Sequence, residues 1–343
     1  MSTLTMGLAV IGGLVLAGVI AHGAWNTRRR SPRMAQRPPV ADSSEGDALL
    51  GERAEPAFNV NFVPIAALEK KPGLDALIDV IAPIALEFPI SGDLAQSAMP
   101  ATRRAGSKPF AVEGCNTLTQ IWESARAGQR YNRFQAGVQM ANRTGALNEI
   151  EYSEFVVKAQ AFADAINGQV EFPEMRDEVA RARELDVFAS SHDAQLGFTL
   201  RARATAWSPG YVQQSAMRQG LIAGALPGRM VLPSGEAHSP ALLSLNFDSQ
   251  AAMAEDPEQS ALRSVTLSLD VPQVARSEQP FVRMRALAVA LAASMDGLIT
   301  DDQGSIIRLE TLDAIGADLE KLYDALDAHD LSAGSDQAKR LFS

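Results

Sequence analysis

Hydrophobic and polar residues along the chain form three successive patterns: one long apolar run, a stretch without periodicity, and then alternating strand and helix patterns. The apolar run, residues 4–21, contains no charged side chain. As a helix it would rise roughly 27 Å at about 1.5 Å per residue, close to the ~30 Å hydrocarbon core of a bilayer. We therefore expect a membrane anchor over residues 1–27, with these apolar side chains facing lipid: Leu8, Val10, Ile11, Leu14, Val15, Leu16, Val19 and Ile20.

The residues on either side of the run predict its orientation. Trp25 lies where amphipathic rings favour the membrane interface, and Arg28, Arg29 and Arg30 follow it, whereas residues 1–7 carry no charged side chain. Because arginines collect on the cytoplasmic side and attract anionic lipid headgroups, we expect the rest of the chain to be cytoplasmic. A cleavable signal peptide would carry its positive charge before the apolar run. A nucleotide-binding turn at the glycines of the run would need a polar N-cap, a GKS or GKT triplet, or a downstream acidic residue for the ribose, and none accompanies them.

Residues 28–72 mix Pro, Ser, Gly and charged residues without apolar periodicity, which is typical of a flexible linker. A coil of about forty-five residues has an r.m.s. end-to-end distance of ~35–40 Å. Such a linker would let a folded unit sample the volume just below the membrane.

Beyond the linker, strand and helix periodicities alternate, most clearly in the second part of the chain. The strand patterns are residues 196–204, 229–233, 240–248 and 265–272, and residues 297–304 (GLITDDQG) predict a short strand and a turn. The helical patterns begin at Ser208, Ser277 and about Glu310. The middle helix places these apolar residues on one stripe: Phe281, Met284, Leu287, Leu291 and Met295. The predicted fold class is α+β, an antiparallel sheet covered on one face by helices.

The same order of patterns occurs twice, which predicts two tandem copies of one domain. Residues 91–99 (SGDLAQSAM) parallel residues 208–217 (SPGYVQQSAM), and both copies end in a helix followed by His-Asp. We expect the first copy at residues 73–192 and the second at residues 193–332. Residues 333–343 would then be a frayed tail, in which Leu341 and Phe342 could still dock.

Composition and charge narrow the functional classes. Charged residues make up 21% of the chain and no second long apolar run exists, so one span is expected. The net charge of −10, without a basic stripe interleaved with aromatics, argues against a nucleic-acid partner. Cys115 is the only cysteine, which fits a reducing compartment and a small buried side chain.

No catalytic or metal-binding pattern is recognisable. The four histidines lack HExxH spacing, and no CxxC pair is present. His192 and His329 follow predicted helices, where an imidazolium suits the helix dipole. Asp301 and Asp302 fit a solvated turn better than a metal pair. We therefore expect no enzymatic activity, cofactor or metal. The polar residues 141–155 predict a loop before a helix, and a partner contact there is an open alternative.

Several motifs resemble one bacterial family. Residues 22–34 (HGAWNTRRRSPRM), after a single span, look like the anchor of the ZipA family of division proteins. Residues 193–330 are similar to its globular domain, most clearly in PALLSLNF, VTLSLDVP and MDGLITDDQG. The resemblance implies a cytoplasmic sheet domain whose uncovered face binds the C-terminal peptide of FtsZ without catalysis. The family's linker is usually long and rich in Pro and Gln, whereas here the first copy takes its place.

The residues that the resemblance places on the peptide-binding face are polar or small. They are Gln195, Gly197, Thr199, Arg201, Ser244, Asn246, Asp248, Thr266 and Ser268. Such a face should bind a hydrophobic peptide weakly, because burial of apolar area at ~25 cal/mol per Å² is the main driving term. The corresponding strand of the first copy is more apolar, with Leu77, Ile81 and Ala85 beside Asp79 and Pro83.

This contrast leads to a hypothesis about the binding site. The peptide would bind to the first copy or between the two copies. The second copy would then be a support, or would offer Arg201 and Arg203 to an acidic residue of the peptide.

Two functions follow from the sequence. The first is a division protein at the bacterial inner membrane that tethers and stabilises the FtsZ ring through the FtsZ C-terminal tail. The alternative is a membrane-anchored binding module with a different cytoplasmic partner.

Overall fold

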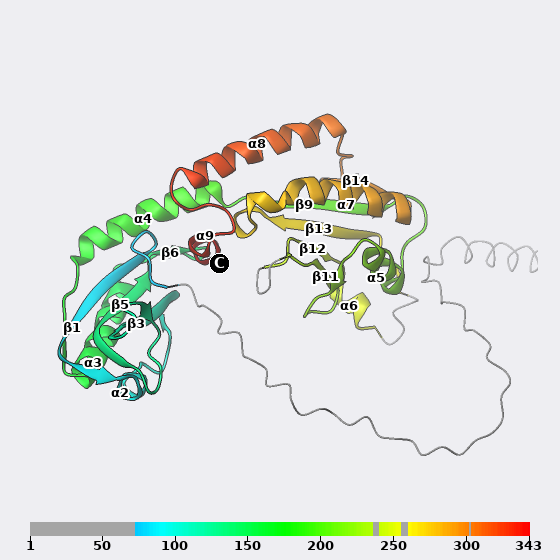
Figure 1. Ribbon diagram of the computed structural model, residues 1–343. Coiled ribbons are helices and arrows are strands. Elements are labelled where there is room, and N and C mark those ends of the chain that lie inside the picture. Colours follow the sequence, from blue (N-terminus) through cyan, green and yellow to red (C-terminus); the bar gives the residue numbers. More distant parts are fainter. Residues whose placement is uncertain (1–72, 236–239, 255–259, 302) are drawn as a thin grey trace, which may run out of the picture.

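The computed structural model describes residues 73–235, 240–254, 260–301 and 303–343. These residues form two α+β halves, each with an antiparallel sheet and helices, as the sequence predicts (Figure 1). We call residues 73–192 the first half and residues 193–332 the second half. Residues 333–343 follow as a C-terminal segment.

The first half is built around a long strand and a long helix. Its elements, in chain order, are β1 (Asp79–Ser91), α2 (Gly92–Ser97), β2 (Arg104–Ala105), β3 (Lys108–Asn116), β4 (Trp122–Glu123), β5 (Arg130–Gln139), β6 (Ala141–Asn142), β7 (Gly145–Ala146), α3 (Glu149–Ala165), β8 (Gly168–Val170) and α4 (Met175–His192). The main sheet has the order β2-β3-β5-β1-β8, with β4 paired to β3. Because strand side chains alternate, Val80, Ala82 and Ile84 of β1 are buried under α3.

The start of α3 explains why residues 141–155 are polar. Asn148 caps the helix by accepting hydrogen bonds from the backbone N–H groups of Ile150 and Glu151, and Glu151 completes a capping box. The residues before it form the short β6–β7 hairpin. Ser153 lies inside the helix.

The second half follows the predicted order of elements closely. They are β9 (Gln195–Ala202), α5 (Pro209–Arg218), β10 (Ile222–Ala223), β11 (Arg229–Leu232), β12 (Leu243–Asn246), α6 (Ser249–Ala252), β13 (Ser264–Asp270), α7 (Pro280–Met295), β14 (Gly297–Thr300) and α8 (Leu309–Asp327). The sheet order is β10-β11-β12-β13-β9-β14. Helices α7 and α8 lie on the same side of this sheet (Figure 1).

The middle helix of the second half begins later than the sequence suggests. A short 3-10 turn covers Arg276–Glu278, Gln279 adopts a left-handed conformation, and α7 starts at Pro280. A residue before proline is disfavoured in the helical region, so the prediction of a helix from Ser277 is wrong by three residues. The predicted stripe holds, because Met284, Leu287, Leu291 and Met295 are all buried.

The two halves share an order of elements. The strands β2, β3, β5, β1 and β8 occupy the same sequence of places as β11, β12, β13, β9 and β14. The helices α3 and α7 are each followed, within two residues, by a residue with positive φ and then a glycine; the positive-φ residues are Asn167 and Asp296. Whether the halves are copies of one domain stays a prediction, which we take up below.

The C-terminal segment joins the two halves and is not frayed as expected. It forms α9 (Asp336–Leu341), capped by Ser335, and buries Leu341 and Phe342 in the core of the second half. That core also includes Ile78 and Ala141 from the first half. The docking is a tertiary effect, because α9 alone is too short to be stable.

The ends of α4 and α8 meet beside this joint. The ring of Phe188 lies between the imidazoles of His192 and His329, with centroid distances of 4.2 and 4.1 Å. Each imidazole Nδ1 lies within 2.9 Å of a helical carbonyl oxygen four residues earlier. Both histidines therefore contact the last carbonyls of their helices, as their positions in the sequence predict.

The predicted membrane anchor and linker lie outside the described residues. Within the described ranges, no helix combines the length and apolar character needed to cross a membrane. The anchor over residues 1–27 and the linker over residues 28–72 therefore stay predictions.

Candidate functional site

The polar residues predicted on one face of the second sheet do lie together. Pairing of β12 with β13 and of β13 with β9 places Ser244, Ser268 and Gly197 in one row across the sheet. The next row holds Asn246, Thr266 and Thr199, and Gln195 and Arg201 lie towards the two ends of β9. The alternate positions, such as Phe198 and Leu267, are buried beneath the helices. We call this surface the polar face.

Side chains on the polar face are hydrogen bonded to one another. The amide nitrogen of Asn246 donates to the hydroxyls of Ser244 and Ser268, at 3.2 and 3.3 Å. Thr300 on the neighbouring strand donates to the carbonyl of Thr199. This face offers hydroxyl and amide groups and little apolar area, so it suits polar or charged groups better than a hydrophobic peptide.

Two residues of the predicted site lie outside the sheets. Asp248 follows the end of β12, and its carboxylate accepts a hydrogen bond from Gln250 as the cap of α6. Leu77 precedes β1 in a turn and is 36% exposed. Neither side chain belongs to a strand face.

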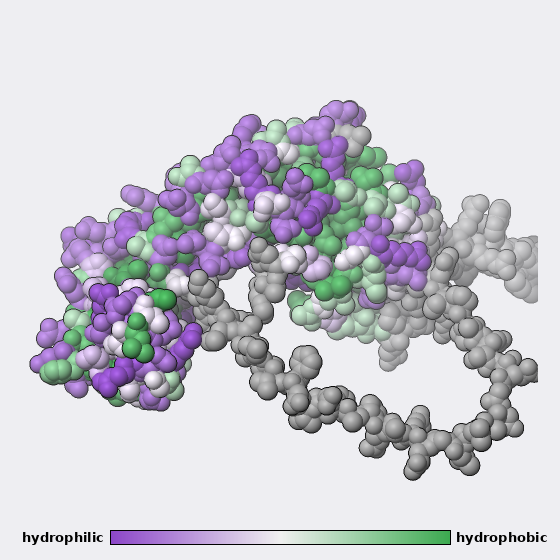
Figure 2. Space-filling view, viewed as in Figure 1, coloured by the Kyte–Doolittle hydropathy of each residue, from purple (hydrophilic) through white to green (hydrophobic). Residues whose placement is uncertain are grey.

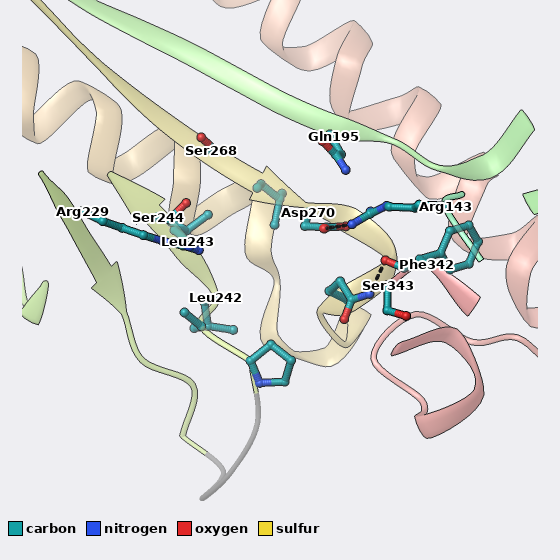
Figure 3. A pocket seen from close by; sticks show the side chains of 14 residues that line it. Arg143, Gln195, Arg229, Leu242, Leu243, Ser244, Ser268, Asp270, Phe342 and Ser343 are labelled. Atoms are coloured by element: carbon teal, nitrogen blue, oxygen red, sulfur yellow. Dashed lines mark hydrogen bonds and ion pairs between the residues drawn. The ribbon is translucent and has the colours of Figure 1, made fainter. Parts of the chain in front are cut away.

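A hollow of about 420 Å³ opens at one end of the polar face, between the two halves (Figure 3). Its lining includes Gln195, Ser244 and Ser268 from the polar face, Leu242 and Leu243 beside them, and Phe342 from the C-terminal segment. Arg143 and Arg229 lie on opposite sides (Figure 3). Because both halves contribute, we call it the central hollow.

The two arginines of the central hollow differ in their electrostatic state. Arg143 reaches from the first half and forms bidentate pairs with Asp193 and Asp270, with N–O distances of 2.6 to 2.8 Å. The hydrogen bonds that Arg143 donates, first to Asp193 and then to Asp270, raise the pKa of its guanidinium group. Arg229 is exposed and forms no ion pair within the described ranges. Arg229 is therefore the cation that can meet an anionic group of a ligand.

The uncovered face of the first sheet carries apolar residues along β1, whereas Arg133 and Gln135 of β5 and Glu113 of β3 lie on the same face. Ile81, Pro83 and Ala85 of β1 point away from α3, and Pro83 and Ala85 are exposed. At the far end, Arg133 lies over the ring of Trp122, 5.3 Å from its centroid. We call this surface the first open face, and it includes Ile81 from the predicted site.

A second hollow, of about 350 Å³, lies between α7 and α8. Apolar residues line it, but its charged rim is paired internally, since Arg276 binds Asp324 at 2.9 Å and Arg285 binds Asp313 at 2.6 Å. Hydrophilic residues cover the outer side along α8 (Figure 2). This hollow presents no unpaired charge to a ligand among the residues described.

Other chemically notable residues have structural partners. Cys115 is fully buried. The carboxylate of Asp301 accepts hydrogen bonds from the backbone of Gln303 and Ser305, as in a solvated turn. Over the described part of the chain, no cluster of three or more His, Cys, Asp or Glu residues is placed to hold a metal.

Sequence reasoning missed the groups that the fold brings in from a distance. Arg143 lies 50 and 127 positions from its two carboxylate partners, and its hairpin carried only a general polar signal. Trp122 belongs to a two-residue strand that no periodicity marks. Arg229 is the first residue of a predicted strand, but its position beside the central hollow depends on the register of β11 with β12.

Comparison with known families identifies part of the second half. Residues 239–318 match the family described as ZipA, C-terminal FtsZ-binding domain. This stretch contains β12, β13, α7 and β14, which carry much of the polar face and its supporting core. The resemblance to ZipA inferred from the sequence is confirmed. No curated protein matches the chain.

Proposed function

We propose that this chain is a cell division protein that binds the C-terminal peptide of FtsZ and tethers the FtsZ ring to the inner membrane. The observation that carries the proposal is the match of residues 239–318 to an FtsZ-binding domain. In the proposed arrangement, residues 1–27 anchor the chain and residues 28–72 connect the anchor to the folded halves. Membrane lipids are then the second partner, through the anchor and its arginines.

We further propose that the two halves are tandem copies of this domain. The support is the common strand order, together with the positive φ of Asn167 and Asp296 before the glycines that start β8 and β14. A duplicated domain offers two sheet faces, and the chain can use one for the peptide and keep the other for support.

The peptide, in this proposal, binds the first open face and reaches the central hollow with an acidic residue. The first open face supplies the apolar contacts around Ile81, Pro83 and Ala85. Arg229 supplies a cation that has no ion pair in the described part of the chain. The polar face itself offers hydrogen bonds but too little apolar area to drive binding alone.

The binding test uses the intact chain, because Ile78 and Ala141 of the first half belong to the core of the second. An FtsZ tail peptide is titrated against the wild type, Ala85→Glu on the first open face, and Thr266→Glu on the polar face, a position outside the lining of the central hollow. We expect Ala85→Glu to weaken binding by roughly tenfold or more, because a charge replaces an apolar contact, and Thr266→Glu to change it little. The opposite ranking would place the peptide on the polar face and refute the assignment.

The tether is tested in dividing cells. A fluorescent fusion should collect at midcell only while FtsZ is present, and deletion of residues 1–27 should release it from the membrane. Diffuse membrane fluorescence during division would instead support the alternative, a membrane-anchored module with another cytoplasmic partner. The polar face favours that alternative, because it differs from the apolar surface a hydrophobic peptide requires.

A further inference from the structure

Exposed apolar side chains gather at the end of the first half that lies away from the second half, where Figure 1 labels α2. Phe88 is 71% exposed, Leu118 86% and Ile121 61%, and Leu94 of α2 is exposed as well. Single exposed apolar residues are common on protein surfaces, but several at one end indicate a contact surface. We call these four residues the distal tip.

Arg130 holds the segments of the distal tip together. Its guanidinium group donates to the carbonyl oxygen of Pro89 at 2.8 Å, and its own carbonyl accepts a hydrogen bond from the N–H of Thr117 at 2.9 Å. Arg130 also pairs with Ser91, the N-cap of α2. Pro89 and Thr117 each precede or follow a residue of the distal tip in the chain. The apolar side chains therefore project from separate segments that the fold brings to one end of the sheet.

The distal tip suits a bilayer surface better than a protein segment. A peptide binds along a groove or a strand edge, whereas the tip offers separate projecting side chains, and neither hollow described above is lined by its residues. Such side chains enter the boundary between lipid headgroups and acyl chains. Trp122 lies next to Ile121, with Arg133 over its ring at 5.3 Å from the centroid. Tryptophan and arginine are both suited to that boundary.

The charges around the distal tip are balanced. Residues 86–94 and 116–133, which form this end, contain the charged residues Glu87, Asp93, Glu123, Arg126, Arg130 and Arg133. The carboxylate of Asp93 accepts a hydrogen bond from the N–H of Gly128, and that of Glu123 accepts one from the amide of Asn116. Apolar contact rather than net charge would therefore drive attachment, and a zwitterionic bilayer is sufficient.

The predicted anchor is close enough for this contact. The described chain begins at Gly73, at the opposite end of β1 from the distal tip, where Leu74 lies over Gly137, the partner of Ile81 on the first open face. The 13 residues of β1 span roughly 40 Å. The predicted linker over residues 28–72, as a coil, has an r.m.s. end-to-end distance of ~35–40 Å. The distal tip can therefore reach the bilayer that holds the anchor.

We propose that the distal tip contacts the surface of the lipid bilayer. The contact is supported by the exposed side chains and their arrangement, whereas its place beside an anchored chain rests on the proposed function. The central hollow lies beyond the other end of β1. It is then held roughly 40 Å from the lipid, where a cytoplasmic partner can reach it.

A nitroxide label at position 118 reports the contact in the full chain reconstituted in phosphatidylcholine nanodiscs. The label is attached to Leu118→Cys in a Cys115→Ala background. Its accessibility to oxygen, which concentrates in lipid, is compared with its accessibility to a water-soluble nickel chelate. A label at Val157→Cys, exposed on α3, is the reference for water. We expect the ratio of oxygen to nickel accessibility to be severalfold higher at position 118 than at position 157.

Two double variants, each measured with the label at position 118, test the side chains of the distal tip. Phe88→Ser with Ile121→Ser should lower the ratio towards the value for water. Ile150→Ser with Val157→Ser is the matched control, which removes two exposed apolar side chains from α3 and should leave the ratio unchanged. All four positions are exposed, so both variants should fold, and circular dichroism checks this.

The proposal is overturned if the label at position 118 is as accessible to the nickel chelate as the label at position 157. Shielding from both reagents, as in a contact with protein, also overturns it, and so does an equal effect of the two double variants. A chain that fails to copurify with nanodiscs contradicts the predicted anchor alone. The same labels are then measured with an excess of phosphatidylcholine vesicles, and the same outcomes decide whether the distal tip binds lipid.

Discussion

The ion pair between Asp79 and Arg340 holds the C-terminal segment against the first half. The loss of stability on removing this pair should depend on pH. The carboxylate of Asp79 has no exposed area, and Arg340 binds it with two guanidinium nitrogens. Arg340 also donates to the carbonyl oxygen of Gly73, at 3.1 Å. Arg340→Met keeps most of the side-chain length but leaves the carboxylate buried without its counter-charge.

The expected loss at neutral pH is about 3–5 kcal/mol of unfolding free energy, the usual cost of removing one partner of a buried pair. Burial raises the pKa of Asp79, and the hydrogen bonds and charge of Arg340 oppose this rise. The variant loses the opposing contribution, so the pKa of Asp79 rises further. A carboxyl group whose pKa is raised in the folded state is more stable protonated there, so stability falls as pH rises from its pKa in the unfolded chain towards its pKa in the folded state.

Urea unfolding at about pH 8 and about pH 4, followed by far-UV circular dichroism, measures this effect. We expect the difference between variant and wild type to be large at the higher pH and much smaller at the lower one. Arg183→Met is the control, because Arg183 pairs with Glu149 at the surface and should cost below about 1 kcal/mol. A loss below about 1 kcal/mol near pH 8, or the same loss at both pH values, would refute the reasoning.

Three further predictions follow from individual contacts, each measured as a shift in the free energy of unfolding. Tyr323→Phe should be neutral or stabilising by up to about 1–3 kcal/mol, because the buried hydroxyl has no hydrogen-bond partner among the described residues; a clear loss would reveal a partner. Trp207→Phe should cost about 1–3 kcal/mol, since Trp207 is fully buried and donates to the Met295 carbonyl at 2.8 Å. Gly228→Ala should cost at least about 1 kcal/mol, because its φ is +76° and an added Cβ would lie 2.5 Å from the carbonyl oxygen of Phe247. Gly128→Ala is the control and should cost less, because Gly128 has the same φ but no atom close to an added Cβ.

Strand faces were the most predictable part of this chain. Alternation in residues 196–204 and 265–272 predicted which side chains would be buried, and Phe198, Leu200, Val265 and Leu267 are buried as expected. The reason is physical, since a slip of one residue would expose every apolar side chain of the strand. The sequence therefore predicted which residues lie on the polar face of the second sheet.

Local signals were less reliable where tertiary contacts decide the structure. Ser208 with Pro209 marked the start of α5 correctly, because capping is a local interaction. The segment after Asp330 carried the same type of signal in Ser335, which caps α9. Its helix depends on burial of Leu341 and Phe342 between two distant parts of the chain, which periodicity in eleven residues does not reveal.

The candidate site also combines features that the sequence predicts with features that only tertiary contacts create. The residues of the polar face lie on strands and followed from register, whereas the central hollow is formed by groups from both halves. Arg143 obtains its role from Asp193 and Asp270, and no spacing rule connects the three.

The contacts of Arg340 and Gln337 also bring the two ends of the described part together. Arg340 binds the carbonyl of Gly73, and Gln337 donates to Asp75 at 2.8 Å. The folded body can therefore be closed into a ring by a short peptide between positions 343 and 73, and reopened at an exposed turn such as the one at Gly128. A circular permutant of this kind would keep both sheets while moving the attachment point of the chain away from the first open face.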